Sequence, residues 1–288
     1  MQIDFQREKN WWDAKAPAEE HDLGDEFVNR ALRWREIGRH LAGVRTILDV
    51  GAGTGAFSIP LAEQGFLVTH LDFSPAMIAI ARGKARHLPT LRFVEANAVQ
   101  LPFPDRSFDL VLNLDGAASF CGPQAERAIE ESCRVARRKL ILTVSNWSSL
   151  IAVTVSASLH VTGRLAPAVY AMFERGQWHQ EEFPENPLLS KGCTQDYLGP
   201  LRAFLPAELR ALLSAAGMKL LRIGGLGSLA RLCDPGDLES ARRDPVVLDE
   251  FIDACERFDL EVLPDGPGTR QRAGLIAVAE RREDAPDA

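Results

Sequence analysis

Short apolar runs alternate with amphipathic stretches along the first half of the chain. Five runs have the length and composition of buried parallel strands, at 46–50, 66–71, 91–95, 107–113 and 139–144. Helical patterns lie between them, and a further helix is predicted at 206–217, with Pro206 at its first turn and Gly217 at its end. Two more strands are predicted at 219–223 and 274–279. The chain is therefore expected to be an α/β protein with seven strands.

Three segments interrupt this alternation. We expect a helical cap segment at 1–45, a sheet-forming core at 46–144 and a cap or lid insertion at 145–205. The last part, 206–288, completes the sheet and contains a second insertion at 225–272. The first insertion carries prolines in its later part, which predicts loops and short helices, and the second contains one amphipathic helix near 247–258. Long additions to a compact domain are usually lids or binding elements.

Tryptophans stand out in the N-terminal segment. Apolar residues from Phe27 to Leu41 recur at helical spacing, which predicts a helix packed on the edge of the sheet. The adjacent Trp11 and Trp12 cannot both face one core from a regular element. At least one of them is therefore a candidate to cover a ligand, although large aromatic side chains are more often simply buried.

A glycine-rich turn follows the first predicted strand. Gly51, Gly53 and Gly55 alternate with small residues and precede a predicted helix at 56–64. Strand, glycine turn and helix together let a backbone approach a nucleotide closely. The spacing is G-x-G-x-G, one residue shorter than the G-x-G-x-x-G of dinucleotide-binding folds, and Asp49 precedes the first glycine by two positions.

Further polar residues end the following predicted strands. Asp72 comes after the second strand, at about the twenty-residue offset where a carboxylate accepts hydrogen bonds from ribose; a solvated loop acid is the alternative. Asn97 follows the third strand, and the fourth, which begins Ser-Phe-Asp, ends near Asn113 and Asp115. In open α/β sheets ligands bind outside the carboxyl ends of the strands, so these residues are expected to border a ligand.

These motifs resemble class I S-adenosylmethionine (SAM) dependent methyltransferases, of the small-molecule branch that includes the ubiquinone/menaquinone C-methylases. The resemblance covers 46–144 and implies a doubly wound, seven-stranded, mostly parallel sheet of the Rossmann-like type with helical cap insertions. It implies that Asp72 holds the SAM ribose and that Asn97 and Ala98 meet the adenine, although the family usually has an acid where Asn97 stands. The full implied cofactor-binding set is Asp49, Gly51, Ala52, Gly53, Gly55, Asp72, Phe73, Met77, Asn97, Ala98 and Asn113.

A general base is optional for methyl transfer, because only some acceptors must lose a proton. His179 lies beside Trp178 and two glutamates in the lid, where carboxylates raise the basicity of an imidazole, and a surface histidine is the alternative. Asp115, His21 and Tyr197 are weaker candidates. No metal is expected, because the histidines do not pair with another histidine or cysteine at ligand spacing.

Charge and cysteine content limit the partners. The net charge is −7, which disfavours nucleic acid and anionic membranes as partners, and the apolar stretch at 150–161 is too short to span a bilayer. Five widely spaced cysteines are expected to be reduced thiols of a cytoplasmic protein. The function indicated is methyl transfer from SAM to a small molecule. Two alternatives stay open: a non-catalytic SAM- or nucleotide-binding regulatory module, and an NAD-dependent oxidoreductase on a related fold.

Overall fold

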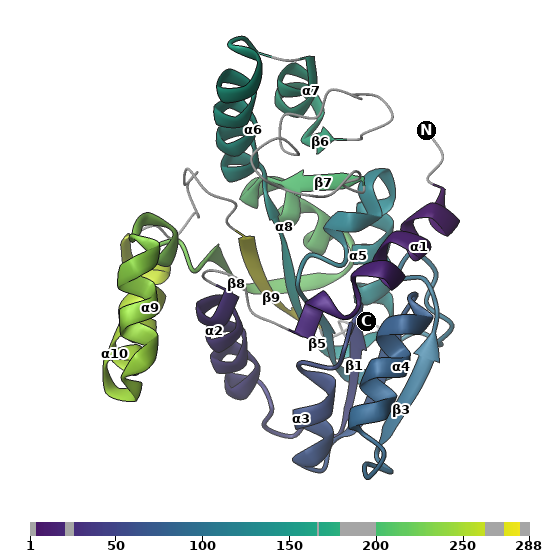
Figure 1. Cartoon of the computed structure of the whole chain (residues 1–288). Coiled ribbons are helices and arrows are strands. Elements are labelled where there is room, and N and C mark those ends of the chain that lie inside the picture. Colours follow the sequence, from purple (N-terminus) through teal and green to yellow (C-terminus); the bar gives the residue numbers. More distant parts are fainter. Residues whose placement is uncertain (1–3, 21–25, 166, 179–199, 263–273, 283–288) are drawn as a thin grey trace.

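The computed structural model describes residues 4–20, 26–165, 167–178, 200–262 and 274–282 (Figure 1). Its centre is a mostly parallel sheet, and the seven predicted strands are all present. They are β1 (Thr46–Val50), β2 (Leu67–Asp72), β3 (Leu91–Glu95), β4 (Phe108–Asn113), β5 (Ala136–Asn146), β8 (Met218–Leu226) and β9 (Gly274–Arg281). Strands β3-β2-β1-β4-β5 are parallel in that order, and β9 runs antiparallel between β5 and β8.

Two short strands were not predicted. β6 (Gln177–Trp178) pairs with β7 (Leu201–Phe204), and β7 continues the sheet beside the end of β5. β8 is also longer than predicted, since it pairs with β9 from Met218 to Leu226. Its end contains Gly224 and Gly225, residues that local propensity disfavours in a strand, so the pairing partner decides its length.

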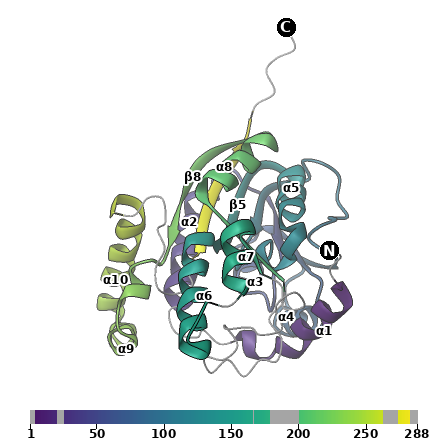
Figure 2. The ribbon, with the colours of Figure 1, turned by 90° about the horizontal axis from the view of Figure 1, so that it is seen from above.

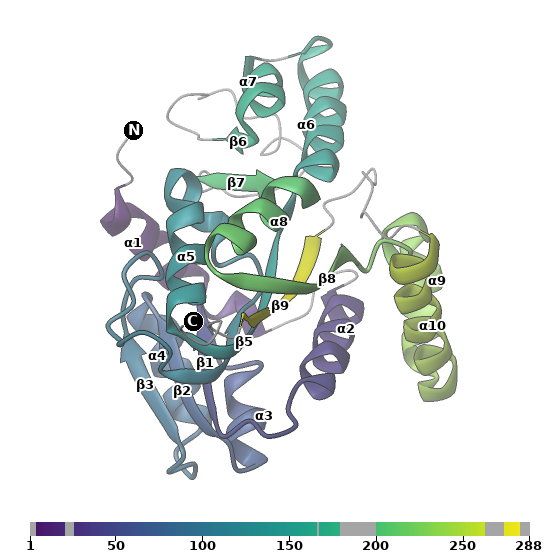
Figure 3. The same cartoon turned by 180° about the vertical axis from the view of Figure 1, so that it is seen from behind.

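Helices cover both faces of the sheet. Helices α2 and α3 lie on one face and α5 and α8 on the other (Figures 1 and 3). The helices are α1 (Phe5–Lys15), α2 (Glu26–Arg39), α3 (Ser58–Glu63), α4 (Pro75–Lys84), α5 (Ala125–Val135), α6 (Trp147–Thr162), α7 (Pro167–Arg175), α8 (Pro206–Ala215), α9 (Pro235–Arg243) and α10 (Pro245–Arg257). Short 3-10 turns lie at Ala18–Glu20, Ser119–Gln124 and Ala230–Leu232, and a π-helical turn at Phe258–Val262. None of these described helices has the length and apolar character to cross a membrane.

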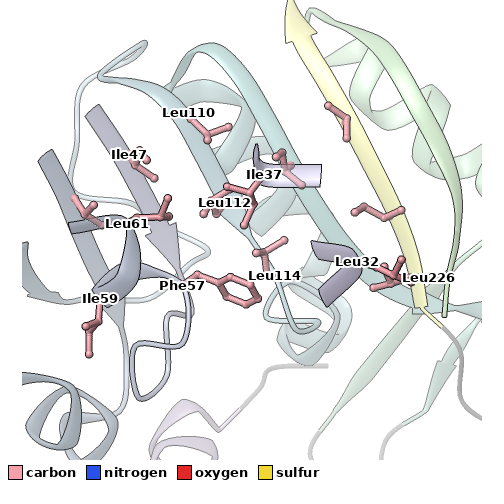
Figure 4. Close-up of a cluster of buried hydrophobic side chains, with 14 of the residues drawn as sticks. Leu32, Ile37, Ile47, Phe57, Ile59, Leu61, Leu110, Leu112, Leu114 and Leu226 are labelled. Carbon is pink, nitrogen blue, oxygen red and sulfur yellow. The ribbon is translucent and has the colours of Figure 1, made fainter. Parts of the chain in front are cut away.

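Each face of the sheet has its own hydrophobic core. On the α2 side, Leu32 and Ile37 pack with Ile47, Leu110 and Leu112 of the strands (Figure 4). Alternate strand residues point to the opposite face, where they pack against α5 and α8. Burial on both faces explains why the strands are continuous apolar runs, and it fixes their carboxyl ends as a rigid edge.

The Ser-Phe-Asp start of β4 ties this strand to β1. Asp109 accepts hydrogen bonds from the backbone of Arg45 and Thr46, each at 3.0 Å, and from the Thr46 hydroxyl at 3.1 Å. Burial alone would raise the pKa of Asp109, but these hydrogen bonds and one from Arg137 hold it at about 2. The carboxylate therefore fixes the two strands side by side.

The insertions form two helical pairs. The first contains α6 and α7, with β6 and β7 after them (Figure 1). Helix α6 has 16 residues, longer than the predicted short helices, because the prolines of this segment all follow it. In the second insertion α9 and α10 lie to one side of the sheet, beyond α2 (Figure 2). Helix α10 matches the predicted amphipathic helix, with Ile252 and Cys255 buried.

Candidate functional site

The glycine turn is shaped by close packing. Gly51 has a φ of +68°, and a Cβ at this position would lie 2.4 Å from the Cβ of Ala117. Gly55 has a φ of +95°, and its Cβ would lie 2.6 Å from Ile59 of α3. Gly53 has open space around it: apart from its chain neighbours, no residue would lie within 4 Å of a Cβ at this position. Gly51 and Gly55 are thus required by the fold, whereas Gly53 leaves room beside the backbone.

Asp72, at the end of β2, holds the turn in place. Its two carboxylate oxygens accept hydrogen bonds from the backbone of Gly53 and of Ser74, both at 2.8 Å. Burial raises its pKa, these backbone hydrogen bonds oppose the shift, and the charge of Asp13 adds to it. Each oxygen keeps a further lone pair, so the carboxylate can still accept from a ligand.

Asp49, near the end of β1, is a buried acid, and one of its carboxylate oxygens has no hydrogen-bond partner. The residue is 1% exposed, and the oxygen without a partner is Oδ2. Burial, together with the charges of Asp115 and Asp72, raises the pKa of Asp49 to about 8. A carboxylate held in this way is stabilised by a cation placed beside it.

These residues border a cavity of about 400 Å³ at the carboxyl ends of β1, β2 and β4. The order of the parallel strands reverses between β1 and β4, and open α/β sheets bind ligands at such a switch point. The predicted residues that line the cavity are Asp49, Gly51, Ala52, Gly53, Asp72, Phe73, Met77, Asn97, Ala98 and Asp115.

Two predicted cofactor residues do not line the cavity. The Asn113 side chain is buried, where it donates to the Ser132 hydroxyl at 3.0 Å and accepts from the backbone of Ala118 at 3.2 Å. It supports the loop after β4 from behind. Gly55 lies in the turn before α3, outside the lining.

The N-terminal helices form the outer wall of the cavity. Trp12 of α1 lines it and meets Phe120 edge to face, with ring centroids 5.1 Å apart. Arg33 of α2 also lines it, with a side chain only 9% exposed, and forms an ion pair with Asp115. The lining also includes Glu19, whose pKa is raised by burial.

Sequence reasoning missed the contribution of α2. The sequence feature that could have revealed α2 is a pair of polar residues, Asn29 and Arg33, spaced four residues apart on the buried side of the helix. Such a pair within a buried helix face marks a polar site rather than core. Thr143 of β5 was also missed; it is buried, it lines the cavity, and its hydroxyl has no hydrogen-bond partner.

Of the four predicted catalytic residues, Asp115 is described and lies at the cavity. Its backbone φ is +54°, an uncommon conformation that aspartate tolerates better than most residues. His21, His179 and Tyr197 lie outside the described residues. Within the described ranges, His, Cys, Asp and Glu side chains do not gather in groups of three that could bind a metal ion.

Comparison with known proteins gives a consistent picture. Residues 47–139 match the family described as "Methyltransferase domain". A demethylmenaquinone methyltransferase of Thermus thermophilus is 43% identical over 111 residues, which cover 36% of this chain and 49% of that protein. One of Renibacterium salmoninarum is 32% identical over 136 residues, covering 46% and 55%. The chain thus spans about half the length of these curated relatives.

Solved structures show the same fold. A SAM-dependent methyltransferase of Methanosarcina mazei has a TM-score of 0.53 at 19% identity, covering 86% of this chain and 97% of that one. A putative methyltransferase, solved in complex with the Haloferax volcanii Trm112 methyltransferase activator, has a TM-score of 0.54 at 18% identity, covering 97% and 99%. Residues 47–139 thus match a methyltransferase domain, and the chain as a whole has the fold of these solved methyltransferases.

Proposed function

We propose that this protein transfers a methyl group from SAM to a small-molecule acceptor and releases S-adenosylhomocysteine. The observation that carries the proposal is the convergence of Gly53, Asp72 and Asp49 on one cavity at the switch point of the sheet. The residues fit the cofactor. Asp49 offers an unpartnered, buried oxygen to the α-ammonium group, and Gly53 leaves space for a ligand beside the turn.

The other lining residues divide along the cofactor. Asp72 accepts from the ribose hydroxyls with the lone pairs that its backbone contacts leave open. The Asn97 side-chain oxygen already accepts from the backbone of Val99 at 3.1 Å, and its second lone pair would be left to accept from the adenine amino group. Phe73, Met77 and the backbone of Ala98 complete the adenine site.

The protein contributes placement and exclusion of water to the reaction. When bound, SAM would supply an electrophilic methyl group that the acceptor attacks in line, with S-adenosylhomocysteine as the leaving group, so no covalent enzyme intermediate is needed. Trp12 and Phe120 line the cavity and pack against each other. Fixing two reactants in such an enclosed site supplies much of the rate. If the acceptor must lose a proton, Asp115 is the described candidate, with His179, His21 and Tyr197 as the further ones.

The acceptor is determined outside the matched domain. The family match covers 47–139, whereas α1, α2, α6 and α7 lie before or after it. The relatives are demethylmenaquinone methyltransferases by name, so a demethylated quinol is the first acceptor to test. We further propose a cytoplasmic protein without nucleic-acid partners, based on the described cysteines, which are thiols and not disulfides, and on the net charge of −7.

The test combines binding with turnover. S-adenosylhomocysteine binding is measured by calorimetry, and methyl-labelled SAM is incubated with small-molecule, protein and nucleic-acid fractions of an extract. We expect binding, and label in the small-molecule fraction. Asp72→Ala should weaken binding at least about tenfold, since it removes hydrogen bonds to a charged group. Asp105→Ala, at an exposed position outside the cavity, is the matched control.

The other outcomes separate the alternatives. Binding without label in any fraction would favour a regulatory SAM-binding module. Label confined to protein or nucleic acid would leave the cofactor assignment and overturn the acceptor class. Binding of NAD but not of S-adenosylhomocysteine would point to the oxidoreductase.

A further inference from the structure

The ion pair between Arg33 and Asp115 is unequally buried. The Arg33 side chain is 9% exposed at the cavity, whereas the Asp115 side chain is 50% exposed. The Nε atom of Arg33 is buried and has no hydrogen-bond partner. Arg33 is thus held inside with part of its donor set unused, and its counter-ion comes from the loop that follows β4.

This inequality makes the carboxylate partner exchangeable. A buried guanidinium requires an anion, since an uncompensated buried charge is strongly destabilising. Asp115 can return to water at low cost because half of its side chain is already exposed. Guanidinium groups bind carboxylates through charge-assisted hydrogen bonds, and Arg33 lines the cavity into which such a group would enter. A second carboxylate that enters the cavity can therefore replace Asp115.

The amino-acid end of SAM carries such a carboxylate beside an ammonium group. Two buried side chains of opposite type line the cavity, the acid Asp49 and the base Arg33. We propose that Arg33 binds the α-carboxylate of the cofactor and that Asp115 occupies this place in the ligand-free protein. This inference rests on the proposed function, because it concerns the binding of the same cofactor.

The exchange also affects the neighbouring acids. The negative charge of Asp115 contributes to the raised pKa of Asp49. The α-carboxylate that replaces Asp115 keeps a negative charge beside Arg33, and the ammonium group that arrives with it favours the ionised form of Asp49. The two contacts to the amino-acid end therefore support each other, and Asp115 becomes available at the cavity for the acceptor.

Two ligands separate this contact from the rest of the site. S-adenosylhomocysteine carries the amino-acid end, whereas 5′-methylthioadenosine shares the adenosine and the thioether sulfur but lacks it. We would measure the affinity of both by calorimetry for the wild type, Arg33→Met, Asp115→Asn and the double variant. Arg35→Met is the matched control, since Arg35 is on the same helix and pairs with Asp249 and Asp253 away from the cavity.

We expect Arg33→Met to weaken S-adenosylhomocysteine binding by about 10- to 100-fold, as for a lost hydrogen-bonded charge contact. Binding of 5′-methylthioadenosine should stay within about twofold in this variant, which also shows that the site is folded. Asp115→Asn should tighten S-adenosylhomocysteine binding by about 3- to 10-fold, since a competing carboxylate is removed. In the background of Arg33→Met this gain should disappear, and Arg35→Met should change neither affinity.

Three results would overturn the inference. Equal losses for both ligands in Arg33→Met would give Arg33 a purely structural role. Unchanged binding of S-adenosylhomocysteine in that variant would place the carboxylate elsewhere. Weaker binding in Asp115→Asn would show that Asp115 assists the cofactor instead of competing with it. Failure of the wild type to bind either ligand would overturn the proposed function as well, so the two failures are distinct.

Discussion

At the scale of single residues, Asp49 shows a conflict between stability and binding. Its carboxyl is buried, one of its oxygens lacks a partner, and its pKa is raised to about 8. The folded protein therefore binds a proton at Asp49 that the unfolded chain, with an ordinary pKa near 4, does not retain at neutral pH. Such residues are kept at functional sites at the expense of stability.

We predict that Asp49→Asn stabilises the ligand-free protein. Because the pKa of Asp49 is raised in the folded state, the wild type loses stability as pH rises from about 4 to about 8. The amide does not ionise, so the variant should gain about 1–3 kcal/mol at pH 7.5 and almost nothing at pH 4. Urea unfolding at both pH values measures the difference.

The same variant should bind S-adenosylhomocysteine at least about tenfold more weakly, because the contact with the α-ammonium group loses its charge. A variant that is less stable than the wild type at pH 7.5 would contradict the assignment of Asp49 as a strained binding group.

The sequence reveals some site residues better than others for a physical reason. Gly51, Gly53 and Asp72 belong to local strand-turn-helix units, whose conformation is encoded within a few neighbouring residues. The pairing of Arg33 with Asp115 joins α2 to the loop after β4, far along the chain. Its geometry depends on how α2 packs, which no local pattern contains.

At the scale of elements, α2 serves two purposes. Its core side, with Leu32 and Ile37, packs on the sheet, and its cavity side carries Arg33. Another side faces α10 through ion pairs, in which Arg39 contacts Glu256 at 2.6 and 2.9 Å. Helix α10 is therefore tied to α2, the helix that carries Arg33.

We predict that Ile252→Ala in α10 destabilises the protein by about 2–4 kcal/mol, because it opens a cavity in the core shared with α2. Val246→Ala on the same helix is the control; Val246 is 67% exposed, so its truncation should stay within about 0.5 kcal/mol. Urea unfolding monitored by circular dichroism checks both values. Similar losses in the two variants would mean that α10 does not dock as described.

The hydrophobic pattern predicts elements best where both faces are buried. Strands β1 and β4 were recognised as apolar runs because the core on each side selects apolar residues. The short strands β6 and β7 have two and four residues, too few to carry a periodic signal. They exist because β7 meets the end of β5, which is a tertiary event.

At the scale of the whole molecule, α1 bridges the two sides of the cavity. On one side Asp13 accepts hydrogen bonds from the Ser74 hydroxyl at 2.5 Å and from the backbone of Ala76 at 3.2 Å, at the start of α4. On the other side Trp12 packs against Phe120, which follows β4. The cavity lies between these anchors, so α1 closes over the switch point of the sheet.

Because α1 contacts both sides of the cavity, it should control how fast a ligand leaves. We predict that Asp13→Ala raises the dissociation rate of S-adenosylhomocysteine by about 3- to 10-fold, as expected when roughly 1 kcal/mol of anchoring is lost. Stopped-flow displacement measures this rate.

Asp244→Ala is the control. Asp244 caps α10 by accepting a hydrogen bond from the backbone of Val246 at 2.9 Å, so its loss should cost a similar free energy of unfolding away from the cavity. Faster release in both variants would mean that general destabilisation, and not the anchoring of α1, sets the rate. Faster release in Asp13→Ala alone would identify α1 as the element that retains the ligand.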